Sequence, residues 1–468
     1  MKRRDFVKLL SIGVSSLVIP ARARTRGLLA AQKSSPPKPG YEGIDRLLKF
    51  ADPLPIPSRL QPVGKNKGKL EYKVRMMQFQ QRLHSQLPPS TLWGFEGKYP
   101  GPVIEGVVNE PMSIEWINQL PEKHLFEIDT TIHGAMPPAP SVRTVTHLHG
   151  AHTAPENDGL PEKWIQPGHS VTYHYPNQQR AATLWYHDHA LGITRLNNYA
   201  GLAGMYFLRG EEEKKLNLPA GPYEIPLVLQ DRLLNDDGHL IYSASSMTIR
   251  RIAPGIWGPE FFGNVPVVNG AIFPYLEVEP RRYRLRVVNA SNSRFFSVFF
   301  SDPAIPFSNV AMKFFQIGTD GGLLPQPVEV TSVMLGPGER ADLVVDFFGH
   351  EGKKLIVSNY ASAPFPGTGM DESPMKAAPL QQLMEVRVTA SLRGKDNSAK
   401  PAWSVPFERL QAEAAAKTRD LVLYEFLDAL QNSHGLKINR LGYDDPVTET
   451  PKLNTTEIWR FINTTDDT

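Results

Sequence analysis

Two pairs of histidines have a spacing that suits metal binding. The first pair is His147 and His149, in Thr-His-Leu-His-Gly, and the second is His187 and His189, in Trp-Tyr-His-Asp-His. On a β-strand, residues i and i+2 lie on the same face, so each pair aims two imidazoles in one direction. Two such strands in one sandwich bring four nitrogens around a small volume. Imidazole suits copper, zinc, iron and nickel, and with no thiol and few acids nearby the sequence favours all-nitrogen copper or zinc.

Eight further histidines do not repeat this pattern. We expect them to be surface or hydrogen-bonding residues, because each stands alone or outside the i, i+2 register: His84, His124, His152, His169, His174, His239, His350 and His434. Asp188, between the members of the second pair, should point to the opposite face of its strand and is not expected to be a ligand.

Composition limits the possible classes of protein. The chain has 468 residues, of which 41% are hydrophobic and 21% charged, with 42 Pro and no Cys. This apolar fraction can build cores, and so many prolines favour short strands over long helices. The absence of Cys from the chain excludes disulfides, iron–sulfur clusters and any copper site that needs a thiolate. The net charge of +3 arises from residues 1–31, which carry +6, so the remainder carries −3 and nucleic acid is not an expected partner.

The first 31 residues have the pattern of an export signal. A charged start with paired arginines, Arg3 and Arg4, precedes an apolar run over residues 9–19 and a small-residue stretch at 21–23. The apolar run is about half of the ~20 residues that span a bilayer, so it predicts a signal peptide and no stable membrane anchor. The Arg-Arg-x-Phe-x-Lys pattern resembles a twin-arginine signal, which implies a periplasmic or extracellular protein.

The chain also contains an internal repeat. Three segments share a Pro-x-x-Glu sequence followed by an apolar strand that ends in Asn, and their glutamates, Glu105, Glu277 and Glu449, are separated by 172 residues each time. Equal spacing twice favours a triplicated domain. Short strand-like runs between Gly/Pro turns predict an all-β protein of tandem Greek-key β-sandwiches. An Ala/Glu-rich stretch at 409–417 is expected to be helical within a linker.

These features predict a domain organisation in five parts. They are a signal peptide (1–31), a first sandwich with a Pro-rich N-terminal arm (32–213), a second sandwich (214–390), a linker (391–418) and the start of a third sandwich (419–468).

The histidine motifs resemble the first two copper-binding motifs of the multicopper oxidases. Further stretches resemble the branch of bacterial spore-coat laccases and bilirubin oxidases: residues 93–97, 100–102, 175–179, 194–197, 316–322 and 445–451. The resemblance implies three cupredoxin-like domains and four copper ions. It also implies oxidation of a phenolic, pyrrolic or metal-ion reductant with reduction of dioxygen to water.

The resemblance also assigns roles to individual residues. It implies that His147 ligates the type 2 copper and that His149, His187 and His189 ligate the type 3 pair. Asp158 matches an acid that helps to move protons near the dioxygen channel in this family, although Asp158 equally suits a simple turn position in Glu-Asn-Asp-Gly.

The sequence departs from the family pattern in its third domain. The chain has no Cys for a type 1 copper, and the family's other two His-x-His motifs follow the strand that here ends at Asn463. We therefore expect a truncated third cupredoxin domain, half of the trinuclear-cluster ligands, little activity of the chain alone, and a second polypeptide as a candidate for completing the domain. The alternative is a non-enzymatic, exported cupredoxin-like protein that binds copper or serves as a scaffold.

Overall fold

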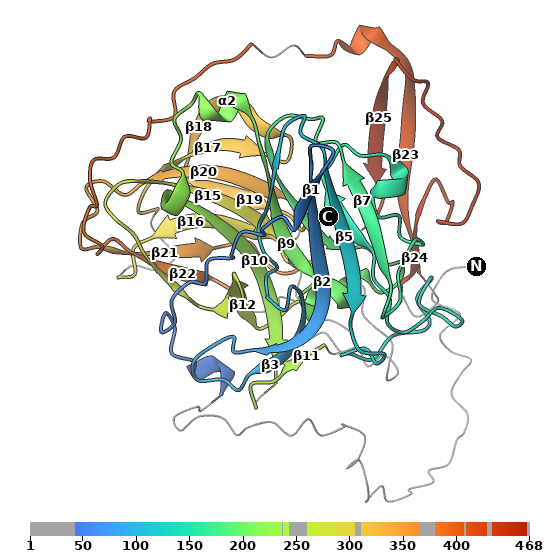
Figure 1. Ribbon diagram of the computed structural model, residues 1–468, viewed down its shortest axis with the longest axis horizontal. Helices are drawn as coiled ribbons and strands as arrows, with labels where there is room; N and C mark the ends of the chain where they lie inside the picture. The colour runs from blue at the N-terminus through green and yellow to red at the C-terminus, as the bar shows by residue number, and fades with distance from the viewer. Residues whose placement is uncertain are drawn as a thin grey trace, which may run out of the picture. The chain divides into compact units, whose positions relative to one another are not determined.

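Strands make up almost all of the regular structure (Figure 1). The computed structural model describes residues 43–235, 237–242, 260–304, 310–365, 380–406, 409–427 and 433–465. The predicted all-β class is confirmed, whereas the predicted signal peptide lies outside the described residues. Within these ranges, no helix combines the length and the apolar character that crossing a bilayer requires.

The first sandwich carries both histidine motifs. In one sheet the order is β1-β2-β5-β7 with β3 paired to β2, and in the other it is β4-β9-β8-β6. Along β5, inward-facing Ile114 and Trp116 alternate with half-buried Ser113 and Glu115, as expected for a strand with one face in a core. The strands are β1 (Gly64–Asn66), β2 (Lys69–Gln81), β3 (Ser90–Phe95), β4 (Ile104–Val107), β5 (Met112–Gln119), β6 (Thr146–His149), β7 (Ser170–Tyr175), β8 (Ala182–Asp188) and β9 (Ala203–Arg209).

Strand β8 is buried on both faces. Every residue of β8 is buried, and its neighbour β9 is nearly as buried, whereas its other neighbour β6 alternates between buried and half-buried residues. Leu184 and Tyr186 lie in the core of the first sandwich. Trp185, on the other face, packs in a smaller cluster with Val228 and Val288 of the second sandwich. The strand that carries His187 is therefore held from both sides.

The second sandwich packs an eight-stranded sheet on a five-stranded one. The order of the larger sheet is β13-β12-β10-β15-β20-β17-β18 with β11 paired to β10, and that of the smaller is β14-β22-β21-β16-β19. Its core contains buried side chains of both sheets, including Leu285, Leu343 and Phe300. The strands are β10 (Glu224–Leu234), β11 (Leu240–Ile241), β12 (Val265–Val268), β13 (Ala271–Ile272), β14 (Tyr275–Glu277), β15 (Arg282–Asn289), β16 (Phe296–Ser301), β17 (Phe314–Thr319), β18 (Gly322–Val330), β19 (Ser332–Leu335), β20 (Arg340–Asp346), β21 (Lys354–Asn359) and β22 (Gln382–Arg387).

A third sheet repeats one detail of the first two. It contains β23 (Ala415–Leu427), β24 (Ser433–Ile438) and β25 (Thr456–Asn463). The parallel pair β23–β25 corresponds to the parallel pairs β2–β5 and β10–β15. Asn118, Asn289 and Asn463 lie at or one residue before the ends of β5, β15 and β25, and each Asn side-chain oxygen accepts a hydrogen bond at 3.0 Å from the N–H two residues on. This shared strand ending supports the repeat, while the exact domain boundaries stay a prediction.

The described helices are short. They are α1 (Thr194–Ala200), α2 (Glu211–Lys214) and the 3-10 turns η1 (Ile44–Arg46), η2 (Pro155–Asn157), η3 (Gly221–Tyr223) and η4 (Ala412–Ala414). The expected helix at 409–417 is wrong, because this stretch forms only η4 before β23 begins at Ala415. Backbone pairing of β23 with β24 and β25 outweighs the helix preference of Ala and Glu.

A buried ionic cluster joins the first two sandwiches. Arg286 on β15 donates hydrogen bonds to Glu224 and Glu213, and its Nη1 reaches the Thr183 hydroxyl on β8 at 3.0 Å. Arg209 on β9 donates to Glu224 at 2.6 Å. The carboxylates therefore have charged partners from both sandwiches.

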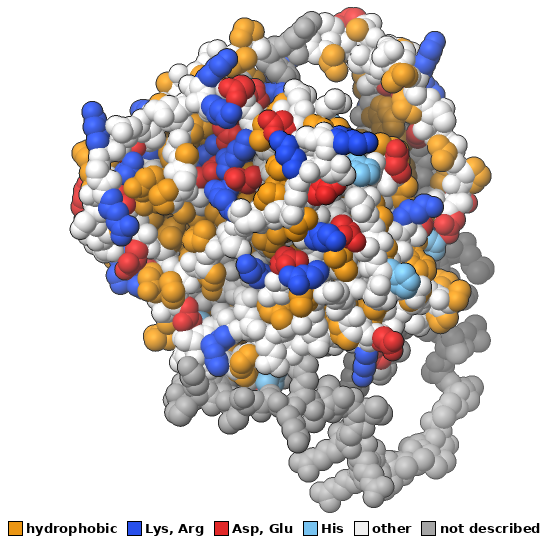
Figure 2. All heavy atoms as spheres, viewed as in Figure 1, with side chains coloured by type: hydrophobic (Ala, Val, Ile, Leu, Met, Phe, Trp, Pro, Cys, Tyr) orange, Lys and Arg blue, Asp and Glu red, His pale blue; other side chains and the backbone are white. Residues whose placement is uncertain are grey.

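On the face of the molecule drawn in Figure 2, basic and acidic side chains are interspersed.

Candidate metal centre

The pairing of β6 with β8 places the two histidine motifs on one face. In this antiparallel ladder His147 lies opposite His187 and His149 lies opposite Trp185. Asp188 lies opposite Thr146, so its side chain belongs to the other face. The geometry predicted from the i, i+2 spacing is thus present for His147 and His149, and His187 lies on the same face, whereas His189 follows the end of β8 at Asp188.

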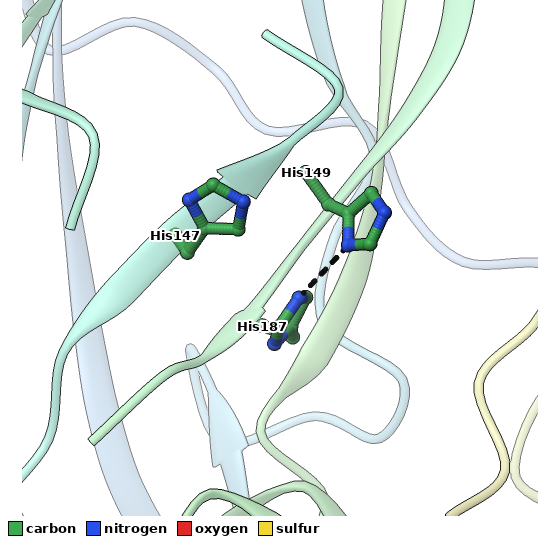
Figure 3. Close-up of side chains that lie close together, drawn as sticks. All are labelled: His147, His149 and His187. Atoms are coloured by element: carbon green, nitrogen blue, oxygen red, sulfur yellow. Dashed lines mark hydrogen bonds between the residues drawn. The ribbon is translucent and has the colours of Figure 1, made fainter. Parts of the chain in front are cut away.

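Three imidazoles lie within reach of a single ion. Each of His147, His149 and His187 offers one ring nitrogen, and these nitrogens all lie within 4.8 Å of one another. The Nδ1 of His149 is 3.3 Å from the Nε2 of His187, as the dashed line in Figure 3 shows. His189 lies at the edge of this group, with its ring centroid 4.9 Å from that of His147. The structure therefore brings all four predicted histidines together, three of them most closely.

Backbone carbonyls and one indole fix the orientation of the rings. The Asp158 carbonyl accepts a hydrogen bond from Nδ1 of His147 at 2.6 Å, and the Asp188 carbonyl accepts one from Nδ1 of His187 at 2.7 Å. These bonds leave Nε2 as the nitrogen of each ring for a ligand role, and Nε2 of His187 faces Nδ1 of His149. Trp185 stacks on His187 with ring centroids 4.1 Å apart and an interplanar angle of 27°.

The protonation states suit metal binding. Burial, reinforced by the charge of Arg340, lowers the pKa of His149 to about 4. Burial also lowers the pKa of His187 and His189, and neighbouring imidazoles add to the effect. Neutral imidazole is the form that binds a metal ion, so these rings need no deprotonation near pH 7.

Asp158 contacts the site through both its backbone and its side chain. It follows the 3-10 turn η2, and its carboxylate oxygen lies 3.5 Å from Nδ1 of His147. The next residue, Gly159, has φ +79°, and a Cβ there would lie 2.3 Å from the Thr146 carbonyl oxygen. Only glycine allows this loop to approach β6 so closely. No sequence pattern predicts the carbonyl contact, although Asn-Asp-Gly does predict the turn.

The second sandwich also reaches the site, which the motifs did not predict. A Cβ on Gly338 would lie 3.3 Å from Cε1 of His149, so the turn before β20 covers this ring. Arg340 donates from Nε to the Thr183 carbonyl on β8 at 3.1 Å and from Nη1 to the Gly338 carbonyl at 2.9 Å. These residues are far from the histidines in the sequence, so no local pattern predicts the contacts. The Gly-Pro-Gly sequence predicts the turn itself and nothing more.

Other histidines have separate partners. His124 shares a hydrogen bond with Asn197 at 3.0 Å, His84 lies 3.1 Å from the Leu48 carbonyl, and His174 lies 2.8 Å from the Ser113 hydroxyl. Among the described residues, the only cluster of three or more potential ligands is the one built on His147.

The donor set fits a cation that accepts imidazole. It contains nitrogen donors without a thiolate, which suits copper or zinc. The Nδ1 of His189 is buried and has no hydrogen-bond partner in the part of the chain that the structure describes. A buried ring nitrogen without a partner is costly unless a ligand satisfies it.

Comparisons with known proteins identify the family. The family profile described as multicopper oxidase matches residues 139–213. A laccase of Bacillus subtilis is 43% identical over 436 residues, covering 90% of this chain and 81% of that protein. A laccase of Bacillus stratosphericus is 39% identical over 437 residues, covering 90% and 82%.

Solved structures show the same fold at lower identity. The laccase of Pediococcus acidilactici superposes with a TM-score of 0.68 at 24% identity, covering 89% of this chain and 78% of that one. The McoA multicopper oxidase of Aquifex aeolicus gives 0.66 at 22% identity, covering 89% and 82%. The sandwiches are thus cupredoxin-like, and the chain is a laccase-like member of the multicopper oxidase family.

Proposed function

We propose that this protein is a copper-dependent oxidase whose first sandwich supplies four histidine ligands. His147 would hold a type 2 copper, and His149, His187 and His189 would hold the type 3 pair. The observation that carries the proposal is the group of three imidazole nitrogens within 4.8 Å on two paired strands. In the family, bound copper supplies the redox chemistry that couples oxidation of a small-molecule reductant to reduction of dioxygen.

The chain's own residues prepare this site. The Asp158 and Asp188 carbonyls orient two rings, Trp185 stacks on His187, and the turn at Gly338 shields His149 from one side. We assign Asp158 a role as proton relay, because its carboxylate is 35% exposed and also lies beside His147. Asp158→Asn keeps the backbone carbonyl, so it should preserve copper content while lowering turnover. Equal turnover with the two side chains would contradict the relay.

The test of the main proposal is copper binding by the purified full chain. We expect cupric ion to bind with the paramagnetic spectrum of a nitrogen-ligated site. Turnover is then measured as oxidation of a phenolic dye with oxygen uptake. A chain that binds no copper would contradict the proposal.

The second candidate function is a non-enzymatic, exported copper-binding or scaffold protein. The absence of Cys from the chain favours it, because blue-copper sites take a thiolate ligand. Bound copper without dye oxidation supports this second function, and dye oxidation by the chain alone contradicts it.

Two further proposals concern partners and location. Apolar side chains of the third sheet are exposed, with Phe461 at 65% and Leu436 at 71%, which supports a cover of further polypeptide, either continuous with the chain or separate. Export through a twin-arginine signal is supported by Arg3 and Arg4 within the Arg-Arg-x-Phe-x-Lys pattern and by the apolar run over residues 9–19. Replacing both with Lys should retain the protein inside a bacterial host, as cell fractionation would detect.

A further inference from the structure

Asp188 is a buried carboxylate that lies between two proposed ligands and faces away from them. Its side chain is on the core-facing side of β8, and the residue is only 1% exposed. We propose that this carboxylate is a positioning residue that joins the ends of β6 and β8 and so sets the distance between the two histidine pairs. The inference rests on the proposed copper site.

The two carboxylate oxygens bind backbone on both sides of the ligands. Oδ2 accepts a hydrogen bond at 2.9 Å from the N–H of Val145, which precedes β6. Oδ1 accepts one at 3.0 Å from the N–H of Ala190, which follows His189. In addition, the N–H of His189 donates to the Val145 carbonyl at 2.8 Å. The Asp188 side chain thus links the residue before β6, the strand of His147, to the residue that follows His189.

Helix α1 holds this carboxylate in place. The Nδ2 of Asn197 donates to Oδ1 of Asp188 at 2.9 Å, and Asn197 is fully buried. Asn198 accepts a hydrogen bond at 3.0 Å from the N–H of Asp188 itself. His124 in turn shares a hydrogen bond with the Asn197 side-chain oxygen at 3.0 Å. The arrangement fixes Asp188 by packing and by hydrogen bonds, as a supporting residue for metal ligands requires.

The chemistry of the contacts distinguishes a carboxylate from its amide. The three groups that contact the side-chain oxygens are donors, from Val145, Ala190 and Asn197. An asparagine has the same size but only one acceptor oxygen, so its NH₂ group would face at least one of these donors. Asp188→Asn should therefore release one attachment without emptying the space. Loss of a supporting partner of this kind costs about 10- to 100-fold in metal affinity.

The experiment compares the full chain with Asp188→Asn and with a matched control. The control is Asp231→Asn in the second sandwich, because Asp231 is equally buried at 1% and accepts a backbone N–H from Gly263 at 2.6 Å. Each chain is titrated with cupric ion against a competing chelator, and the electron paramagnetic resonance spectrum of the bound ion is recorded. Hydrogen–deuterium exchange of residues 143–149 reports on the start of β6.

We expect Asp188→Asn to bind cupric ion at least about tenfold more weakly. We also expect it to change the copper spectrum and to speed exchange at 143–149. Asp231→Asn should lower stability while leaving affinity and spectrum unchanged. Unchanged affinity and spectrum in Asp188→Asn would overturn the inference alone, whereas a wild-type chain that binds no cupric ion would contradict the proposed function as well.

A second variant keeps the test open if Asp188→Asn does not fold. Asn197→Ala removes one donor to Asp188 but leaves the carboxylate and both backbone contacts. It should weaken cupric binding in the same direction and by less. An unchanged affinity and copper spectrum in a folded Asn197→Ala chain would overturn the inference.

Discussion

His147 of β6 and His187 of β8 are partners across the antiparallel ladder, with ring centroids 5.6 Å apart. This pairing converts two short sequence motifs into one nitrogen-rich face. A slip of one residue between β6 and β8 would turn the side chains of one strand to the opposite face, so the register of this pairing keeps the two rings together.

Removal of a single imidazole should lower copper content selectively. We expect His149→Ala and His187→Ala to lose most of the bound copper, by at least about tenfold in affinity. His84→Ala is the control, because His84 is also buried, at 1%, but contacts the Leu48 carbonyl. Metal analysis of the purified chains provides the measurement. Equal losses in all three variants would mean that the strand-face geometry is not responsible for binding.

Bound copper should stabilise the fold. A ligand that binds only the native state adds about 2.7 kcal/mol to the free energy of unfolding at 100 times its Kd. We expect the thermal midpoint of the wild-type chain to rise with cupric ion and to fall back with a chelator. His149→Ala should show a smaller rise, while His84→Ala should respond as the wild type does.

Gly159 offers a test of the loop that orients His147. Gly159→Ala combines a positive φ with a Cβ placed 2.3 Å from the Thr146 carbonyl, so the loop must move away from β6. Gly168→Ala is a matched control, because Gly168 has φ +84° with no atom within 4 Å of the added Cβ. Both should lose about 1–2 kcal/mol from backbone strain. Only Gly159→Ala should also weaken cupric binding, as measured by chelator competition.

The ionic cluster between the sandwiches should make the protein sensitive to acid. Burial alone would raise the pKa of Glu224, but the charge of Arg286 and the hydrogen bond from Arg209 outweigh it and hold this pKa below its usual value of 4.5. A carboxyl with a lowered folded pKa stabilises the fold above its unfolded pKa, and this contribution disappears as the pH falls. We therefore expect the unfolding free energy to decrease below about pH 4.5.

Two variants distinguish the contribution of Glu224 and its arginine partners from the general effect of acid on the stability of the protein. Glu224→Gln should cost about 3–5 kcal/mol at pH 7, because it removes one carboxylate charge from a buried cluster of arginines, and it should flatten the acid dependence. Glu413→Gln, at an exposed position, should change neither. Chemical denaturation at a series of pH values measures both quantities, and parallel pH profiles for the wild type and Glu224→Gln would contradict the assignment.

Much of the candidate metal site could be predicted from the sequence, because the period of a β-strand is fixed. The spacing of His147 and His149 determines that both lie on one face, whatever the surrounding fold. The contribution of Asp158 could be anticipated as a nearby acid but not as a backbone carbonyl, since every residue type has one. Contacts from Gly338 and Arg340 depend on how two sandwiches pack, which no local pattern encodes.

The secondary structure likewise contains strands that the sequence predicts and strands that it does not. Strands such as β10 and β20 could be predicted from β-branched runs between turns, whereas the Ala/Glu-rich start of β23 could not. There, pairing with β25 supplies the stabilisation that the local sequence lacks. Strand β8 is a third case. Both of its faces are buried, so it lacks the alternation of buried and exposed residues by which a strand with one solvent-facing side is predicted.

That double burial has a consequence for assembly. Leu184 lies in the core of the first sandwich, and Trp185, on the other face of β8, packs with Val228 and Val288 of the second sandwich. That second face of β8 therefore stays exposed to solvent until the second sandwich packs against it. It follows that the side of the proposed copper site next to Gly338 closes over His149 only after the second sandwich has been synthesised and has docked.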